Sequence, residues 1–457
     1  MSFAPILSLL LVFGLVGPGE GAAKEKACKG KDCVKQDLDR DGTPNAVDPE
    51  PGLDVTMELV ESIPVETQGL DWPEVRNTQE VWLEMLGKAK NTLDIAQFYI
   101  NDVEGEPLSP VIDAVVAAAR RGVHVRILVE ASMAEMSKLA LDRLRAEPEV
   151  EIGLFNIKDV EGGGGINHAK YFIVDRRTVF VGSQNFDWKA LKHIHELGLR
   201  IESRNIATVL GRIFEADYRW AHNGEKTWRE EISDQDHDGV PDDQDSSPVI
   251  PYWAAGSGKG IEFLMLLASP QALNPQGVAP AYPSIISLLD DATETIDMQV
   301  MSYSVEMQDG RRWTDLDDAV RRAVGRGVKV RMNIADWSKK APRIDFLKDL
   351  VRAGVEVKYN TIPPFSGTWT DHTRVDHSKY MVVDGKVAWL GTSNWSGDYF
   401  LGTRNIELIF KDDKVVPMLA KIFEAYWAGP YSEVLDPAKD YPPPIYKLPE
   451  QAPAPGQ

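Results

Sequence analysis

Two stretches of the chain repeat one pattern: NHAKYFIVD at residues 167–175 and DHSKYMVVD at residues 376–384. In both copies a Lys lies 2 residues after the His, and an Asp lies 7 residues after it. A Gly and an Asn follow the same His at 14 and 17 residues. A single His-x-Lys carries little information, but five residue types at matching positions in two copies are difficult to reach by chance. We interpret them as a duplicated motif, with one site assembled from both halves of the chain.

The length and composition indicate a globular protein with two domains or one large pseudo-symmetric unit. The chain has 457 residues, of which 43% are hydrophobic, and a formal net charge of −20. This charge argues against a broad basic face that follows duplex DNA, because such binding relies on many contacts between Lys or Arg and phosphate. A local cluster of His and Lys still suffices for a phosphate site, since charges beyond about 8 Å are largely screened at physiological salt.

The N-terminus has the pattern of a secretory signal peptide. An apolar run at residues 5–16 is followed by Gly-Pro-Gly and by small residues at 21–23, and the run is too short to span a bilayer. We therefore expect residues 1–23 to be removed and the mature protein to be secreted or periplasmic, with no transmembrane segment. Cys28 and Cys33 follow the expected cleavage site, and in an oxidising compartment they can close a small loop.

The rest of the chain consists of two similar halves in which strands and helices alternate. Gly122 and Gly327 each follow an Arg at the expected end of a helix, which is typical of a helix C-terminus. Strands alternating with helices indicate an α/β fold with mixed sheets. In each half we expect a strand, two helix–strand pairs, a further strand, the motif hairpin and a closing helix, the flanking elements lying at residues 55–63, 80–99, 110–130, 150–155 and 207–221, and again at 261–268, 284–303, 316–334, 355–360 and 415–427.

Two acidic loops precede the halves and have the spacing of calcium loops. No flanking helices are evident, so the loops resemble thrombospondin type 3 or dockerin-like loops more than paired EF-hands. We expect Ca²⁺ to bind in a structural role; a solvated acidic linker is the alternative. Oxygen ligands stand at positions 1, 3, 5, 9 and 12 with Gly at position 6: Asp37, Asp39, Asp41, Asn45 and Asp48, and then Asp234, Asp236, Asp238, Asp242 and Asp245. The expected divisions are an N-terminal segment, a first lobe, a linker, a second lobe and a Pro-rich, irregular or disordered tail, at residues 24–52, 53–230, 231–258, 259–435 and 436–457.

The motif suggests phosphodiester chemistry with two imidazoles. Residues i and i+2 of a strand point to the same face, so His168 projects with Lys170, and His377 with Lys379. One imidazole can attack phosphorus and give a phosphohistidine, while the other, protonated, donates to the leaving oxygen and then deprotonates water. Positive donors can hold the charge on the non-bridging oxygens. No metal or other cofactor is required for such a chemical step.

Six further residues are candidates for the same site. His193 and His195 are not among them, because they have no counterparts in the second half, and we interpret them as surface or structural residues. The candidates form three pairs: Asp175 and Asp384, which we expect to support turns and scaffold; Asn185 and Asn394, which can donate to a phosphoryl oxygen; and Glu196 and Glu407, which can accept the Nδ1–H of an active His and fix its tautomer.

At these residues the chain resembles the phospholipase D superfamily, whose members carry a duplicated His-x-Lys-x(4)-Asp motif. The resemblance covers most of residues 55–435 and looks closest to the lysosomal 5′-exonuclease branch, in phrases such as SQNFDW at 183–188 and GTSNWSGDYF at 391–400. It implies two pseudo-symmetric α/β/α sandwich lobes with the active site at their interface. It also implies that His168 is the nucleophile and His377 the acid/base, an assignment that the symmetry of the sequence leaves open.

Three functions are compatible with these observations. The first is a nuclease acting on single-stranded nucleic acid, with bases stacked on aromatic residues beside the motif asparagines. The second is a phospholipase D or transphosphatidylase acting on phospholipid head groups. The third is a calcium-stabilised binding protein with a vestigial site, against which the intact motifs argue. A homodimer is possible in each case. The aromatic residues considered are Phe186, Trp188, Trp395, Tyr399 and Phe400.

Overall fold

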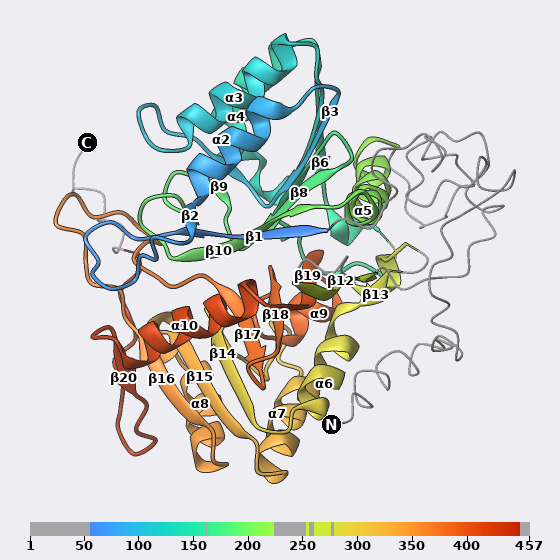
Figure 1. The fold of residues 1–457 in the computed structure, drawn as a ribbon. Coiled ribbons are helices and arrows are strands. Elements are labelled where there is room, and N and C mark those ends of the chain that lie inside the picture. Colours follow the sequence, from blue (N-terminus) through green and yellow to red (C-terminus); the bar gives the residue numbers. More distant parts are fainter. Residues whose placement is uncertain (1–54, 161, 224–252, 256–259, 276–277, 448–457) are drawn as a thin grey trace, which may run out of the picture.

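The computed structural model describes residues 55–160, 162–223, 253–255, 260–275 and 278–447. The expected signal peptide, both cysteines and all ten candidate calcium ligands lie outside these residues. Within them the chain forms two lobes, each built on one large mixed sheet (Figure 1).

The first lobe contains an eight-stranded sheet in the order β2-β1-β10-β8-β7-β3-β5-β6. A two-stranded sheet, β4 (Ile100–Asn101) with β9 (Phe186–Asp187), lies beside it. The large sheet consists of β1 (Thr56–Ser62), β2 (Arg76–Asn77), β3 (Thr92–Gln97), β5 (His124–Glu130), β6 (Val150–Phe155), β7 (Tyr171–Val174), β8 (Thr178–Gly182) and β10 (Glu196–Glu202). The helices are α2 (Thr78–Lys88), α3 (Ser109–Arg120), α4 (Ala134–Arg145) and α5 (Arg204–Asn223).

The second lobe repeats this topology. Its sheet has the order β11-β12-β19-β18-β17-β14-β15-β16-β20, and β13 pairs with β12. The strands are β11 (Trp253–Ala255), β12 (Ile261–Ser269), β13 (Ala279–Pro280), β14 (Thr295–Val300), β15 (Lys329–Ala335), β16 (Glu356–Asn360), β17 (Lys379–Val383), β18 (Val387–Gly391), β19 (Asn405–Asp412) and β20 (Ser432–Val434). The helices are α6 (Ala281–Asp291), α7 (Asp315–Gly325), α8 (Arg343–Arg352), α9 (Gly397–Leu401) and α10 (Val415–Ala428).

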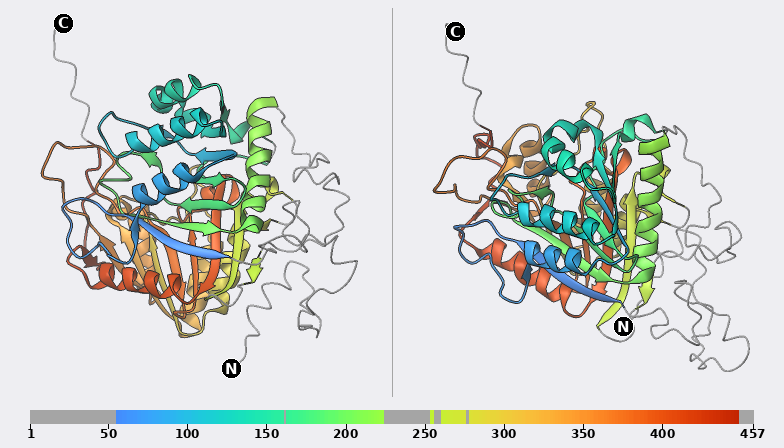
Figure 2. Two further views of the ribbon diagram at one scale, coloured as in Figure 1. Left: turned by 45° about the horizontal axis from the view of Figure 1, so that its top comes forward. Right: turned by 90° about the horizontal axis from the view of Figure 1, so that it is seen from above.

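The layers follow from where each element buries its apolar face. Helices α2, α3 and α4 cover the outer face of the first sheet, and α6, α7 and α8 cover that of the second (Figure 1). Helices α5 and α10 lie at opposite ends of the interface between the sheets, which the rotated views of Figure 2 also show. One hydrophobic core joins residues of both sheets with residues of α5 and α10. The two lobes therefore share one hydrophobic core and are not independent domains.

The expected helix ends are present at the two glycines. Gly122 and Gly327 both have φ of 88°, a left-handed conformation that glycine adopts at low cost. In the first lobe the N–H of Val123 donates to the carbonyl of Ala118 at 3.1 Å, which closes the end of α3. The chain then turns directly into β5, which lies parallel to β3.

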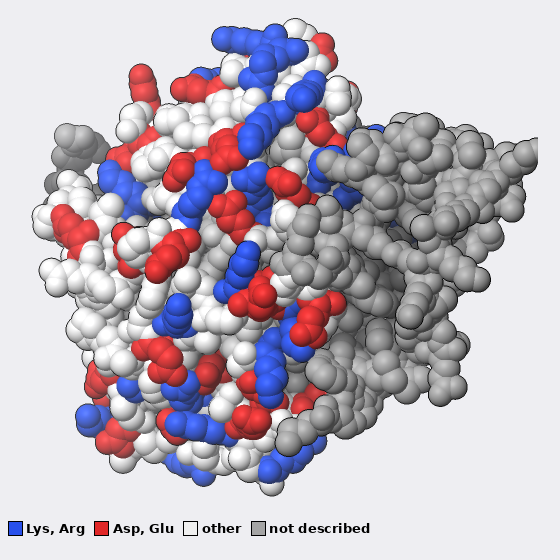
Figure 3. Space-filling view, in the orientation of Figure 1, with Lys and Arg blue, Asp and Glu red and all other residues white. Residues whose placement is uncertain are grey.

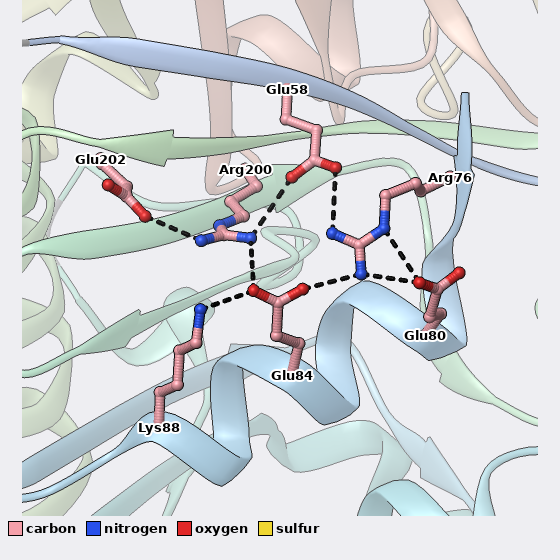
Figure 4. Close-up of polar contacts among 7 residues, drawn as sticks. All are labelled: Glu58, Arg76, Glu80, Glu84, Lys88, Arg200 and Glu202. Carbon is pink, nitrogen blue, oxygen red and sulfur yellow. Dashed lines mark hydrogen bonds and ion pairs between the residues drawn. The ribbon is translucent and has the colours of Figure 1, made fainter. Parts of the chain in front are cut away.

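A network of ion pairs attaches α2 to the edge of the first sheet (Figure 4). Arg76 contacts Glu84 of α2 at 2.7 Å and Glu58 of β1 at 3.3 Å. Arg200 of β10 contacts the same two carboxylates at 3.1 and 3.4 Å. A single exposed ion pair contributes about 0–1 kcal/mol. Here two guanidinium groups share carboxylates from a helix and a strand, so the network fixes the position of α2 relative to β1.

Candidate active site at the lobe interface

The two motifs lie in the middle of their sheets, at equivalent places. Strand β7 lies between β8 and β3, and β17 lies between β18 and β14. The segment before each strand crosses to the opposite lobe: the N–H of His168 donates to the carbonyl of Arg404, and the N–H of His377 donates to that of His195, both at 2.9 Å. The sheets therefore bring both motif histidines to one interface, where each is anchored by the other lobe.

Each imidazole is oriented by a side chain from the opposite lobe. The Nδ1 of His377 lies 2.8 Å from an Oε of Glu196. The Nδ1 of His168 lies 3.1 Å from Oδ1 of Asn405. The amide of Asn405 is itself fixed, because its Nδ2 donates to the carbonyls of Tyr399 and Thr403 at 2.9 and 3.3 Å. Its oxygen must therefore accept from Nδ1–H of His168, which leaves the Nε2 lone pair of that ring available.

Glu407 does not have the orienting role that the sequence suggested for it. The Oε1 of Glu407 accepts from the N–H of Ser393 at 3.1 Å, and no hydrogen bond joins it to His168 in the described part of the chain. The true counterpart of Glu196 is Asn405. Both lie 28 residues after their motif histidine, whereas Glu407 lies 30 residues after His377. A strict count of the offset would have found Asn405, but a search for a second carboxylate missed it.

Both motif lysines are buried and fold back on their own motifs. Nζ of Lys170 donates to the carbonyl of His168 at 2.6 Å, and Lys379 makes the same bond to His377. Burial lowers the pKa of Lys170 well below its usual value, and Lys379 lowers it further. Burial also lowers the pKa of Lys379 to about 7. A phosphate group between the two Lys side chains would raise their pKa values and favour their charged forms, so the site favours the binding of an anion.

Asp175 and Asp384 lie in the turns, away from the imidazoles. The carboxylate of Asp175 accepts from the N–H groups of residues 90, 91 and 92 at 2.7–3.2 Å. Asp384 accepts in the same way from residues 293, 294 and 295. Both have positive φ, 51° and 52°. These are the contacts of turn-supporting residues, which anchor the start of β3 and β14.

The motif asparagines follow the strands that pair with β7 and β17. Asn185 lies just after β8 and Asn394 just after β18, and both are buried. Each accepts at its carbonyl from the N–H two residues later, at 2.7 and 2.9 Å. The role of these amides as donors to a phosphoryl oxygen stays a prediction.

Of the two interpretations given for His193 and His195, surface or structural, the surface one is wrong. Both side chains are buried, His195 completely. His195 pairs with Asp376 of the other lobe, with Nδ1 3.0 Å from Oδ1, and His193 packs between Trp188 and Phe365. Their position next to Glu196 on the crossing segment explains the burial.

Most of the aromatic residues that the sequence placed beside the site belong to the cores. Phe186, Trp395 and Phe400 are fully buried, so base stacking on them is ruled out. Tyr399 does reach the site, with its ring centroid 5.0 Å from that of His168. Phe98, which the sequence did not single out, also lies next to the imidazole, with ring centroids 5.3 Å apart.

Glu407 lies over Gly391, and this contact predicts the effect of a substitution. In Gly391→Ala the new Cβ would overlap Oε2 and Cδ of Glu407. Because that side chain is buried and bonded to Ser393, it has no room to withdraw. We expect the free energy of unfolding in urea to fall by about 1–3 kcal/mol. Gly211→Ala is the control: nothing lies within 4 Å of a Cβ there, and α5 should gain about 0.5–1 kcal/mol. Equal stability of Gly391→Ala and the natural protein would contradict the packing.

Two lobes with one His-Lys pair each, joined across an interface, define a phosphodiesterase of the phospholipase D kind. Residues 82–218 and 285–427 match the family model described as "Cardiolipin synthase, PLD-like domain". The chain belongs to this phospholipase D-like family and is a phosphodiesterase.

Individual relatives agree with this assignment. A probable phospholipase D of Caenorhabditis elegans is 30% identical over 417 residues, which cover 84% of this chain and 71% of that protein. The human 5′-3′ exonuclease PLD3 is 30% identical over 417 residues, covering 84% of this chain and 81% of its own. Among solved structures, the phosphatidylserine synthase of Haemophilus influenzae Rd KW20 superposes with a TM-score of 0.53 at 13% identity, over 78% of this chain and 85% of that one. That likeness supports the fold.

Among the described residues, every helix is too short or too polar to cross a membrane.

Proposed function

We propose that this protein hydrolyses the phosphodiester bonds of single-stranded nucleic acid through a phosphohistidine on His168. The observation that carries the mechanism is the difference between the two orienting side chains. A neutral amide, Asn405, faces His168, and a carboxyl group, Glu196, faces His377. A carboxylate favours an imidazolium, while an amide oxygen fixes a neutral tautomer.

The reaction then divides between the two rings. Nε2 of His168 attacks phosphorus, and the bond to the leaving oxygen breaks as that oxygen takes a proton from His377. His377 next removes a proton from water, whose oxygen attacks phosphorus and releases His168. Lys170 and Lys379 hold the non-bridging oxygens throughout.

Two observations favour a nucleic acid over a lipid surface. The relatives include proteins named 5′-3′ exonuclease PLD3. Phe98 and Tyr399 lie next to His168 and are only half-buried, so a base beside the reacting phosphate has aromatic partners, worth about 1–3 kcal/mol per stacked base.

The surface charge also bears on the form of the nucleic acid. On the face drawn in Figure 3, basic and acidic side chains are interspersed and no broad basic field is visible. Together with the net charge of −20, this disfavours a long duplex, whose binding depends on many phosphate contacts. A short single strand held by the buried lysines does not require such a field.

The alternative is a phospholipase D that acts on phospholipid head groups. Relatives and structural neighbours include a probable phospholipase D and a phosphatidylserine synthase. The two activities share the chemistry at phosphorus and differ in what surrounds it.

A direct comparison of substrates tests the proposal. Labelled single-stranded oligonucleotides, the matching duplexes and phosphatidylcholine vesicles are incubated side by side, with and without EDTA. We expect cleavage of single strands that survives chelation. Choline release without nucleotide release would overturn the nucleic-acid proposal in favour of the lipid alternative.

The pH dependence of kcat/KM provides a second check. Burial, with Lys170 and Lys379 nearby, lowers the pKa of His168 well below 6.5, so the nucleophile stays unprotonated and the acidic limb lies below pH 6.5. Burial raises the pKa of Glu196 to about 8, and burial with Lys379 nearby lowers the pKa of His377 well below its usual value, so the two groups share one proton and titrate as a pair. As pH rises, the pair loses its proton near pH 8, and Lys379 loses its charge near pH 7. We expect activity to decline above about pH 7. A rate that keeps rising to pH 9 would contradict the assignment.

Export and structural calcium belong to the same proposal. Both rest on the sequence outside the described residues: the apolar run at 5–16 and the two loops at 37–48 and 234–245. Mass spectrometry of the mature N-terminus tests the first, and calcium titration by calorimetry tests the second.

A further inference from the structure

The residue before Glu196, His195, holds the segment that carries Glu196 across the interface. His195 precedes Glu196 and is completely buried. Its N–H donates to the carbonyl of Val375 at 3.1 Å, and its carbonyl accepts from the N–H of His377 at 2.9 Å. Its ring packs on Tyr426 with centroids 4.7 Å apart. The backbone of His195 thus forms a one-residue parallel bridge to the segment that carries the second motif histidine.

The side chain of His195 reinforces the same bridge. Its Nδ1 lies 3.0 Å from Oδ1 of Asp376, the residue before His377. That oxygen also accepts from the N–H and the hydroxyl of Ser378, at 3.2 and 2.7 Å. The other oxygen, Oδ2, accepts from Nδ2 of Asn360 at 3.3 Å. The buried carboxylate therefore ties the residues on both sides of His377 to a ring from the other lobe.

The equivalent place in the first lobe lacks this pair of side chains. Arg404 makes the matching backbone bridge to His168. Asn167 precedes His168 as Asp376 precedes His377, but its buried amide atoms have no hydrogen-bond partner among the described residues. Backbone bridging is thus common to both halves, and the ring-to-carboxylate contact beside the motif histidine is found in only one of them.

We propose that His195 is a positioning residue for His377, and that its pairing with Asp376 aligns His377 for protonation of the leaving group. This inference rests on the proposed division of labour between the two histidines. Without the pair, the segment at 375–378 is held by backbone alone, and the contact between His377 and Glu196 loosens. A displacement of about 1 Å at a catalytic group costs on the order of 100-fold in rate.

The test uses two diesters of thymidine 3′-phosphate that differ only in the leaving group, a methyl and a p-nitrophenyl ester. p-Nitrophenolate leaves without a proton, whereas methoxide requires one. Because kcat/KM covers the steps up to the first bond cleavage, we expect His195→Leu to lower it about 100-fold for the methyl ester and by less than about threefold for the p-nitrophenyl ester. His195→Asn keeps a donor near the position of Nδ1 and should recover most of the lost rate. Thermal unfolding of each variant shows whether it is folded.

Asn405→Ala is the matched control. It removes the partner of Nδ1 on His168, so attack is impaired and both esters should slow to the same extent. An equal loss for both esters in folded His195→Leu, or no loss for either, would overturn the positioning role and show that the pair only supports the fold.

His377→Ala tests the two-histidine mechanism, on which the positioning role of His195 depends. That variant should show an even stronger preference for the p-nitrophenyl ester. If it instead cleaves the methyl ester as fast as the natural enzyme, the two-histidine mechanism itself fails. If the natural enzyme cleaves neither thymidine ester, the nucleic-acid proposal fails, and the same comparison is made with p-nitrophenylphosphocholine and glycerophosphocholine.

Discussion

His168→Ala should abolish phosphodiester hydrolysis, with kcat/KM reduced on the order of 10⁴-fold or more. The ring belongs to the first lobe and His377 to the second, and the Nδ1–H of His168 is fixed by Asn405. No other described side chain presents an oriented neutral imidazole there. His377→Ala should also abolish turnover of natural diesters. The measurement is single-turnover cleavage of a labelled oligonucleotide by each purified variant.

The two variants should fail at different steps, which makes the result specific. With a p-nitrophenyl diester, His377→Ala should still form the covalent intermediate but hydrolyse it slowly, so acid-labile phosphoenzyme accumulates. His168→Ala should form none. Because the two residues act as a unit, the double variant should be hardly slower than His168→Ala. Substantial residual activity in His168→Ala would defeat the mechanism.

Arg404→Met should destabilise the protein by about 3–5 kcal/mol, because it leaves a buried carboxylate without its partner. Arg404 and Asp217 are fully buried and come from different lobes. The guanidinium also donates to the carbonyls of Ser269 and Leu273 at 3.1 and 2.8 Å. Burial already raises the pKa of Asp217 to about 6 despite the opposing effect of Arg404. The measurement is the urea midpoint at neutral pH.

Two further variants test whether the loss of the buried ion pair causes the destabilisation. Arg404→Met combined with Asp217→Leu should recover part of the stability, since no unpaired charge remains. Arg352→Ala breaks an exposed pair with Asp349, at 2.7 Å, and should change stability by less than about 1 kcal/mol. An Arg404→Met protein as stable as Arg352→Ala would show that the buried pair does not hold the lobes together.

Much of the fold could be predicted from local patterns. Strand β6 begins and ends at the predicted residues, β1 differs by one residue at each end and α10 by one residue at its C-terminal end, because their apolar periodicity is strong. Helices α4 and α8 were missed. Both are highly charged, and each buries only three or four residues, so periodicity alone gives a weak signal.

The site shows the same division between local and long-range information. The duplicated offsets determined, by themselves, that His168, Lys170, His377 and Lys379 form two equivalent pairs in one family of phosphodiesterases. Which residue orients which imidazole was decided by the tertiary structure alone. Asn405 and His195 act across the lobe interface, on segments more than 180 residues distant in the chain. Sequence periodicity describes how an element faces its own sheet, but a contact between two lobes depends on how their shared core brings them together.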